Sequence, residues 1–78
     1  MNELLLKEFN SERIIYLYQP DGKGEYGEVA YVFADKEAKV TKQSKDDEIG
    51  RYGYKAASKI KECVDKNNLP IKFIQAWY

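Results

Sequence analysis

Hydrophobic and polar positions follow the two-residue period of β-strands in the first half of the chain. Residues 13–19 and 27–34 are rich in β-branched and aromatic side chains, and such residues favour strands. Residues 37–43 alternate between small or apolar and polar side chains, with the short polar turn 35–36 before them. This pattern predicts a third strand that pairs antiparallel with the second.

The period changes to that of a helix in the second half. Residues 44–48 supply capping side chains and negative charge, which favour a helix N-terminus. Residues 67–70 contain two asparagines and a proline, which end a helix. Together these signals predict an amphipathic helix over residues 47–66. Its apolar stripe is spaced by three and four residues and contains Ile49, Gly53, Ala56, Ile60 and Val64.

The two ends of the chain are apolar but too short to assign. Residues 3–9 contain three consecutive leucines, which begin a strand or form one helical turn. Residues 71–78 are too apolar for a free end and should dock, either as a fourth strand or as an extended segment over one face.

These elements predict one small α+β domain that spans residues 1–78. We expect an antiparallel sheet of three to four strands with one amphipathic helix packed on a face, in the order β-β-β-α, followed by the docked tail or strand. Both faces of the central hairpin are apolar, because Ile15 and Leu17 lie opposite Ile14, Tyr16 and Tyr18. One helix covers only one of these faces.

The sequence allows three ways to cover the second face. The N-terminal leucines and the tail from Phe73 onward supply one within the chain, and a second copy of the protein supplies another. A third interpretation is a base-stacking platform for single-stranded nucleic acid. Aromatic residues, together with one arginine, form the candidate interaction surface: Tyr16, Tyr18, Tyr31, Phe33, Arg51, Tyr52, Tyr54 and Trp77.

Composition removes much of the common chemistry. The 78 residues contain 13 Lys plus Arg and 13 Asp plus Glu, so the net charge is zero and does not favour nucleic acid or an anionic membrane. The absence of His excludes a His-based triad or metal site. The balance of 44% hydrophobic and 33% charged residues is that of a globular protein.

The segment from Gly22 to Val29 matches the pattern G-x-G-x-x-G-x-V. A dinucleotide site needs a helix directly after the glycines, but a strand follows here. A kinase loop needs H-R-D and D-F-G motifs, which the chain lacks. We therefore interpret the segment as a hairpin loop. Weak anion binding remains a candidate role for the loop residues Gly22, Lys23, Gly24 and Gly27.

Two further features receive structural interpretations. Residues 46–48 form an acidic cluster that lacks the ligand spacing of a calcium loop, so we expect no metal and no other cofactor. The single cysteine, Cys63, lies on the apolar side of the predicted helix without a His to activate it. We expect it to act as a small buried hydrophobe.

The chain resembles small uncharacterised bacterial single-domain proteins of unknown function. The resemblance rests on residues 20–28, residues 46–53 and the terminal Ala76-Trp77-Tyr78. It implies a bacterial, cytoplasmic setting and attaches no activity to the chain.

The leading functional hypothesis is a non-catalytic protein-interaction module, with self-association into a homodimer as one form of it. It rests on an apolar surface larger than one helix covers. The alternatives are a nucleic-acid-binding accessory domain that uses the strand tyrosines and a phosphate-binding protein that uses the glycine loop. A lone cysteine and the lack of a signal peptide or an apolar membrane span indicate a cytoplasmic protein. The lack of His, of a nucleophile–base pair and of metal-ligand spacing indicates that it is not an enzyme.

Overall fold

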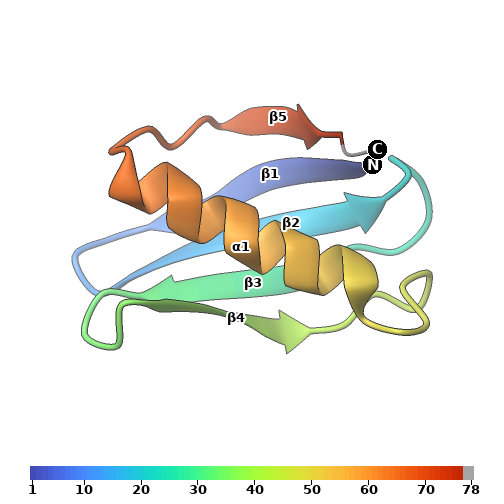
Figure 1. The fold of residues 1–78 in the computed structure, drawn as a ribbon, viewed down its shortest axis with the longest axis horizontal. Helices are drawn as coiled ribbons and strands as arrows, with labels where there is room; N and C mark the ends of the chain where they lie inside the picture. Colours follow the sequence, from blue (N-terminus) through green and yellow to red (C-terminus); the bar gives the residue numbers. More distant parts are fainter. Residues whose placement is uncertain (77–78) are drawn as a thin grey trace.

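The computed structural model describes residues 1–76 and arranges them as a five-stranded antiparallel sheet with one helix across a face (Figure 1). The strands lie side by side in the order β4-β3-β2-β1-β5. This arrangement confirms the predicted α+β class. The elements are β1 (Asn2–Phe9), β2 (Arg13–Pro20), β3 (Gly27–Val32), β4 (Glu37–Lys42), α1 (Arg51–Asp65) and β5 (Lys72–Gln75).

The two ends of the chain, which the sequence left open, both join the sheet as strands. Leu4 of β1 pairs with Tyr18 of β2 on one side and with Phe73 of β5 on the other. The leucines and the tail therefore widen the sheet edgewise. Their expected role as an internal cover for the second face is wrong, because strands in the plane of a sheet cover neither of its faces.

The core lies between the sheet and α1. Tyr16 and Tyr18 of the middle strand are 0% exposed, and Ala56 and Ile60 of α1 pack over them. A small residue at Gly53 permits this close packing, because a Cβ there would lie 2.9 Å from the Tyr18 hydroxyl. The other buried members of this core are Leu4, Ile14, Val29 and Tyr31.

The helix begins four residues later than predicted. Gly50 is its N-cap, in a left-handed conformation with φ of 75°, and Arg51 is its first residue. Ile49 lies outside the helix and is 85% exposed, so its predicted place in the apolar stripe is wrong. The predicted end is confirmed, because the helix stops at Asp65 and Asn67 adopts a positive φ of 53°.

Within residues 1–76, the helix is neither long nor apolar enough to cross a membrane. The same residues contain no group of three Cys, Asp or Glu side chains that are close enough to hold a metal ion.

Candidate functional site

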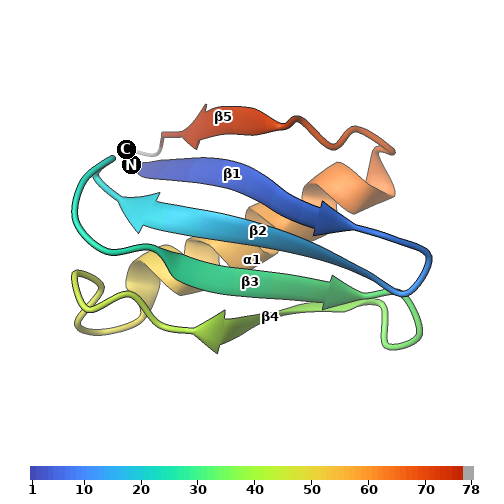
Figure 2. The same ribbon diagram turned by 180° about the vertical axis from the view of Figure 1, so that it is seen from behind.

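No helix or loop of the described chain covers the face of the sheet opposite α1 (Figure 2). The strands bring an apolar strip to this face. On this face Leu5 of β1 pairs directly with Leu17 of β2. Ile15 of β2 pairs with Ala30 of β3. Ile15 is buried and the other members are half-buried. We call this surface the open face and define its apolar strip as Leu5, Ile15, Leu17, Ala30 and Val32.

Ion pairs lie across and around the apolar strip. Lys7 reaches across β2 to the Glu28 carboxylate at 3.2 Å, and the Thr41 hydroxyl donates to the same carboxylate at 2.7 Å. These two contacts lower the pKa of Glu28, with the Thr41 hydrogen bond as the larger cause. Further pairs lie around the strip between Glu3 and Lys72 (3.4 Å), Glu8 and Arg13 (2.7 Å) and Glu37 and Lys39 (3.9 Å).

The aromatic residues of the strands all lie on the helix side of the sheet. The register pairs Tyr16 with Val29 and Tyr31 with Ile14, and these four residues are buried beneath α1. Phe73 stacks edge-on against Tyr16, with ring centroids 5.9 Å apart. The open face is therefore aliphatic, since the strands bring no aromatic side chain to it.

This sorting removes the three strand tyrosines from the predicted interaction surface. Tyr16 and Tyr18 are 0% exposed and Tyr31 is 5% exposed, so they are core residues. Phe33 is half-buried and packs against Tyr31, with ring centroids 5.5 Å apart. The strand tyrosines are thus inaccessible to nucleic-acid bases. Trp77, another member of the predicted surface, lies outside the described residues.

The remaining members, Arg51, Tyr52 and Tyr54, lie in the first turn of α1. Arg51 is exposed, and it lines one hollow together with Tyr52. Tyr54 is 74% exposed on the helix. Tyr52 instead donates its hydroxyl to Asp21 at 3.0 Å. This hydrogen bond is the main cause that raises the pKa of Tyr52, and it is also the main cause that lowers the pKa of Asp21.

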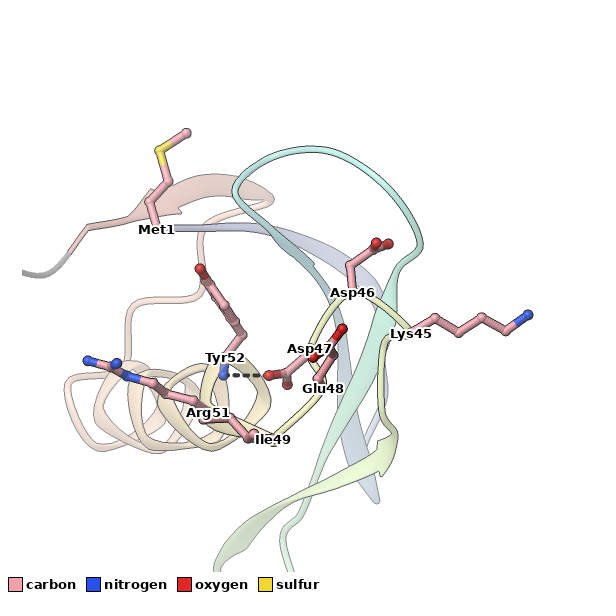
Figure 3. Close-up of a pocket in the computed structure, with 8 residues that line it drawn as sticks. All are labelled: Met1, Lys45, Asp46, Asp47, Glu48, Ile49, Arg51 and Tyr52. Carbon is pink, nitrogen blue, oxygen red and sulfur yellow. Dashed lines mark hydrogen bonds between the residues drawn. The ribbon is translucent and has the colours of Figure 1, made fainter.

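A hollow lies beside this helix start (Figure 3). The Asp47 carboxylate, which is 1% exposed, accepts the backbone N–H groups of Tyr52 at 3.1 Å and Gly53 at 2.8 Å. These bonds occupy helix N–H groups that an anionic ligand would otherwise need. The hollow is lined by Met1, Lys45, Asp46, Asp47, Glu48, Ile49, Arg51 and Tyr52.

The glycine loop has internal partners for its backbone. The N–H groups of Gly22 and Lys23 donate to the carbonyls of Gln19 and Pro20, at 3.1 and 3.2 Å. The Asp46 carboxylate accepts the N–H of Glu25 at 2.8 Å. Gly24 and Gly27 fill positions where a Cβ would lie 2.2 Å from the Asp46 and Tyr18 side chains, respectively. These contacts support a structural role for the loop, and anion binding stays a prediction.

Cys63 is 7% exposed and faces the core from α1. Burial is the largest cause that raises the pKa of its thiol. The thiol therefore has less of the reactive thiolate form at neutral pH than an exposed cysteine.

Comparisons with protein-family models, curated proteins and solved structures gave no match to this chain. The likeness to small bacterial single-domain proteins stays a prediction.

The open face was signalled in the sequence but not assigned as a site. The alternation that places Tyr16 and Tyr18 inward also places Ile15 and Leu17 on the opposite face. Leu5 was missed because its assignment depends on the pairing of β1 with β2. The interaction hypothesis followed the aromatic residues, whereas the uncovered strip is aliphatic.

Proposed function

We propose that this protein is a non-catalytic protein-interaction module whose binding surface is the open face. The observation that carries the proposal is the directly paired Leu5 and Leu17, half-buried on a sheet face that no other described element covers. An apolar strip surrounded by polar residues is typical of a protein-docking surface.

Part of the aliphatic area of the open face stays accessible to water, because four of the five members of the strip are only half-buried. Removing apolar surface from water contributes about 25 cal/mol per Å². The ion pairs around the strip are exposed or half-buried, and such pairs contribute little to affinity. The apolar strip therefore supplies the binding free energy, and the charged side chains across and around it supply orientation.

The proposal assigns neither a catalytic step nor a nucleic-acid ligand. With no His in the sequence, the usual general base of nucleophilic catalysis is missing. The buried strand tyrosines do not favour base stacking over a protein contact. We place the protein in the cytoplasm, where a reduced lone thiol such as Cys63 is stable.

Site-specific photo-crosslinking tests this function. A photoreactive phenylalanine analogue is placed at Leu17 on the open face, and the matched control carries it at Ile49, which is 85% exposed away from that face. After irradiation in living cells, we expect a discrete protein adduct from position 17 that position 49 does not give. The absence of any position-specific protein adduct would contradict the proposal.

A further inference from the structure

The charges of the open face nearly balance within the chain. Each of the four carboxylates has its own cationic partner on the same surface, at 2.7 to 3.9 Å. The exposed Lys42, which pairs with Glu28 in the register of β3 and β4, adds one positive charge, so the face has a net charge of about +1 and no strong field of one sign. An anionic polymer or lipid surface gains little from such a face, because its binding depends on an excess of positive charge.

The apolar strip is shaped for contact with another sheet. Leu17 lies on β2, the middle strand of the five, and the strip around it consists of aliphatic side chains. Aliphatic side chains from two stacked sheets interdigitate at a spacing of about 10 Å. The only element packed on this sheet, α1, lies on the opposite face in the described chain.

We propose that a second copy of this chain covers the open face, in a face-to-face dimer with a two-fold axis near Leu17. This inference rests on the proposed function and identifies the binding partner of the open face as a second copy of the chain. In a two-fold dimer the same patch meets itself, so a patch of one charge would repel its copy. The internally paired charges avoid that repulsion, and each copy offers the other an aliphatic strip of the same kind.

The size of the molecule limits the area of this contact. Its principal dimensions are 30 × 20 × 19 Å. A face of 30 × 20 Å offers at most roughly 600 Å² per copy, so a dimer buries at most roughly 1,200 Å², the lower end of specific interfaces. We therefore expect a reversible dimer that dissociates on dilution.

Sedimentation equilibrium from about 10 µM to 1 mM tests the inference. The wild-type protein should shift from monomer to dimer over this range. Leu17→Lys should weaken the dimer at least about tenfold, because two added ammonium groups approach each other at the axis. Ile49→Lys adds the same charge away from the open face and should dimerise like the wild type.

Circular dichroism and thermal unfolding of each variant check that the sheet is intact. If Leu17→Lys does not fold, Leu5→Thr on the neighbouring strand replaces it, since threonine favours strands and shortens the apolar strip. A wild-type protein that stays monomeric at 1 mM overturns the inference. So does a dimer that is equally stable in the folded open-face variant.

The crosslinking experiment separates this inference from the proposed function. An adduct from position 17 with the mass of two copies supports both. An adduct with a different protein, together with a monomeric wild type, overturns the dimer and leaves the interaction function standing. No position-specific adduct and no dimer contradicts both.

Discussion

The hydroxyl of Tyr18 donates a hydrogen bond to the carboxylate of Asp47 at 3.0 Å, and both side chains are fully buried. Tyr18 lies on the middle strand, and Asp47 caps the first N–H groups of α1 from outside the helix. This one contact therefore fixes the start of the helix over the centre of the sheet. The helix takes the aromatic face for the core and leaves the aliphatic face uncovered.

Tyr18→Phe should destabilise the fold by about 1–3 kcal/mol, because it removes one partner from each of two buried polar groups. The hydroxyl donates to Asp47 and accepts the backbone N–H of Ser44 at 3.0 Å. Urea unfolding, followed by circular dichroism, measures the loss. Tyr54→Phe is the matched control on a side chain that is 74% exposed, and its effect should stay within about 0.5 kcal/mol. If the two variants had equal free energies of unfolding, the hydrogen bonds of the Tyr18 hydroxyl would not stabilise the fold.

Alanine substitutions at Gly27 and Gly53 should lower the free energy of unfolding by different amounts, because the added Cβ would lie at different distances from Tyr18. A Cβ at Gly27 would lie 2.2 Å from the Tyr18 ring, so Gly27→Ala should cost about 1–3 kcal/mol or more through overpacking. At Gly53 the closest atoms lie 2.9 Å away, and alanine favours a helix by about 1 kcal/mol. Gly53→Ala should therefore cost less. The reverse order in urea unfolding would contradict the described packing around Tyr18.

Stability should fall as the solution becomes strongly alkaline. Burial raises the pKa of Tyr16 from its ordinary value of 10.0 to about 12. Folding favours the neutral phenol, so this contribution is complete below pH 10 and is lost as the pH rises from 10 to 12. Urea unfolding at a series of pH values measures the decline. Tyr16→Phe should make the decline shallower, and an unchanged slope would refute the assignment to Tyr16.

A second pH dependence should arise on the acid side from Glu28. Its pKa is lower than the ordinary 4.5, mainly through the Thr41 hydroxyl and also through Lys7. The carboxylate therefore stabilises the fold above pH 4.5, and this contribution is lost as the pH falls through the lowered pKa. Glu28→Gln should be less stable than the wild type at pH 7, with a gap that closes in acid. In a Thr41→Val background the gap at pH 7 should shrink, whereas a gap of the same size would exclude Thr41 as the main cause.

Sequence patterning was sufficient for the elements in which the pattern of apolar residues extends over a long segment. The central strands and most of the helix were predicted because β-branched and aromatic residues concentrate at residues 13–19 and 27–34 and apolar residues recur from Gly53 to Val64. The terminal strands were left undecided because Leu4 gains its burial from partners 14 and 69 positions away, Tyr18 and Phe73. Such long-range pairing leaves no signal in a segment of seven residues.

The helix start and the site needed three-dimensional information for similar reasons. Asp47 belongs to the segment 44–48 that predicts the helix N-terminus, but its carboxylate acts across a turn that ends at Gly50, so the predicted helix begins too early. The aromatic residues were interpreted as a surface because large rings dominate many interfaces. Their burial depends on which face α1 covers, and the apolar patterns of the two faces are too alike to decide this.

The most direct measurement of the central claim is the solvent accessibility of the Leu17 methyl groups as a function of protein concentration. A soluble paramagnetic agent broadens the NMR signals of methyl groups that it reaches. If a second copy covers the open face, the broadening at Leu17 should decrease between about 10 µM and 1 mM protein, and that at the exposed Ile49 should stay constant. Equal broadening of Leu17 at every concentration would contradict the claim that this face is the interface of the protein with its own copy.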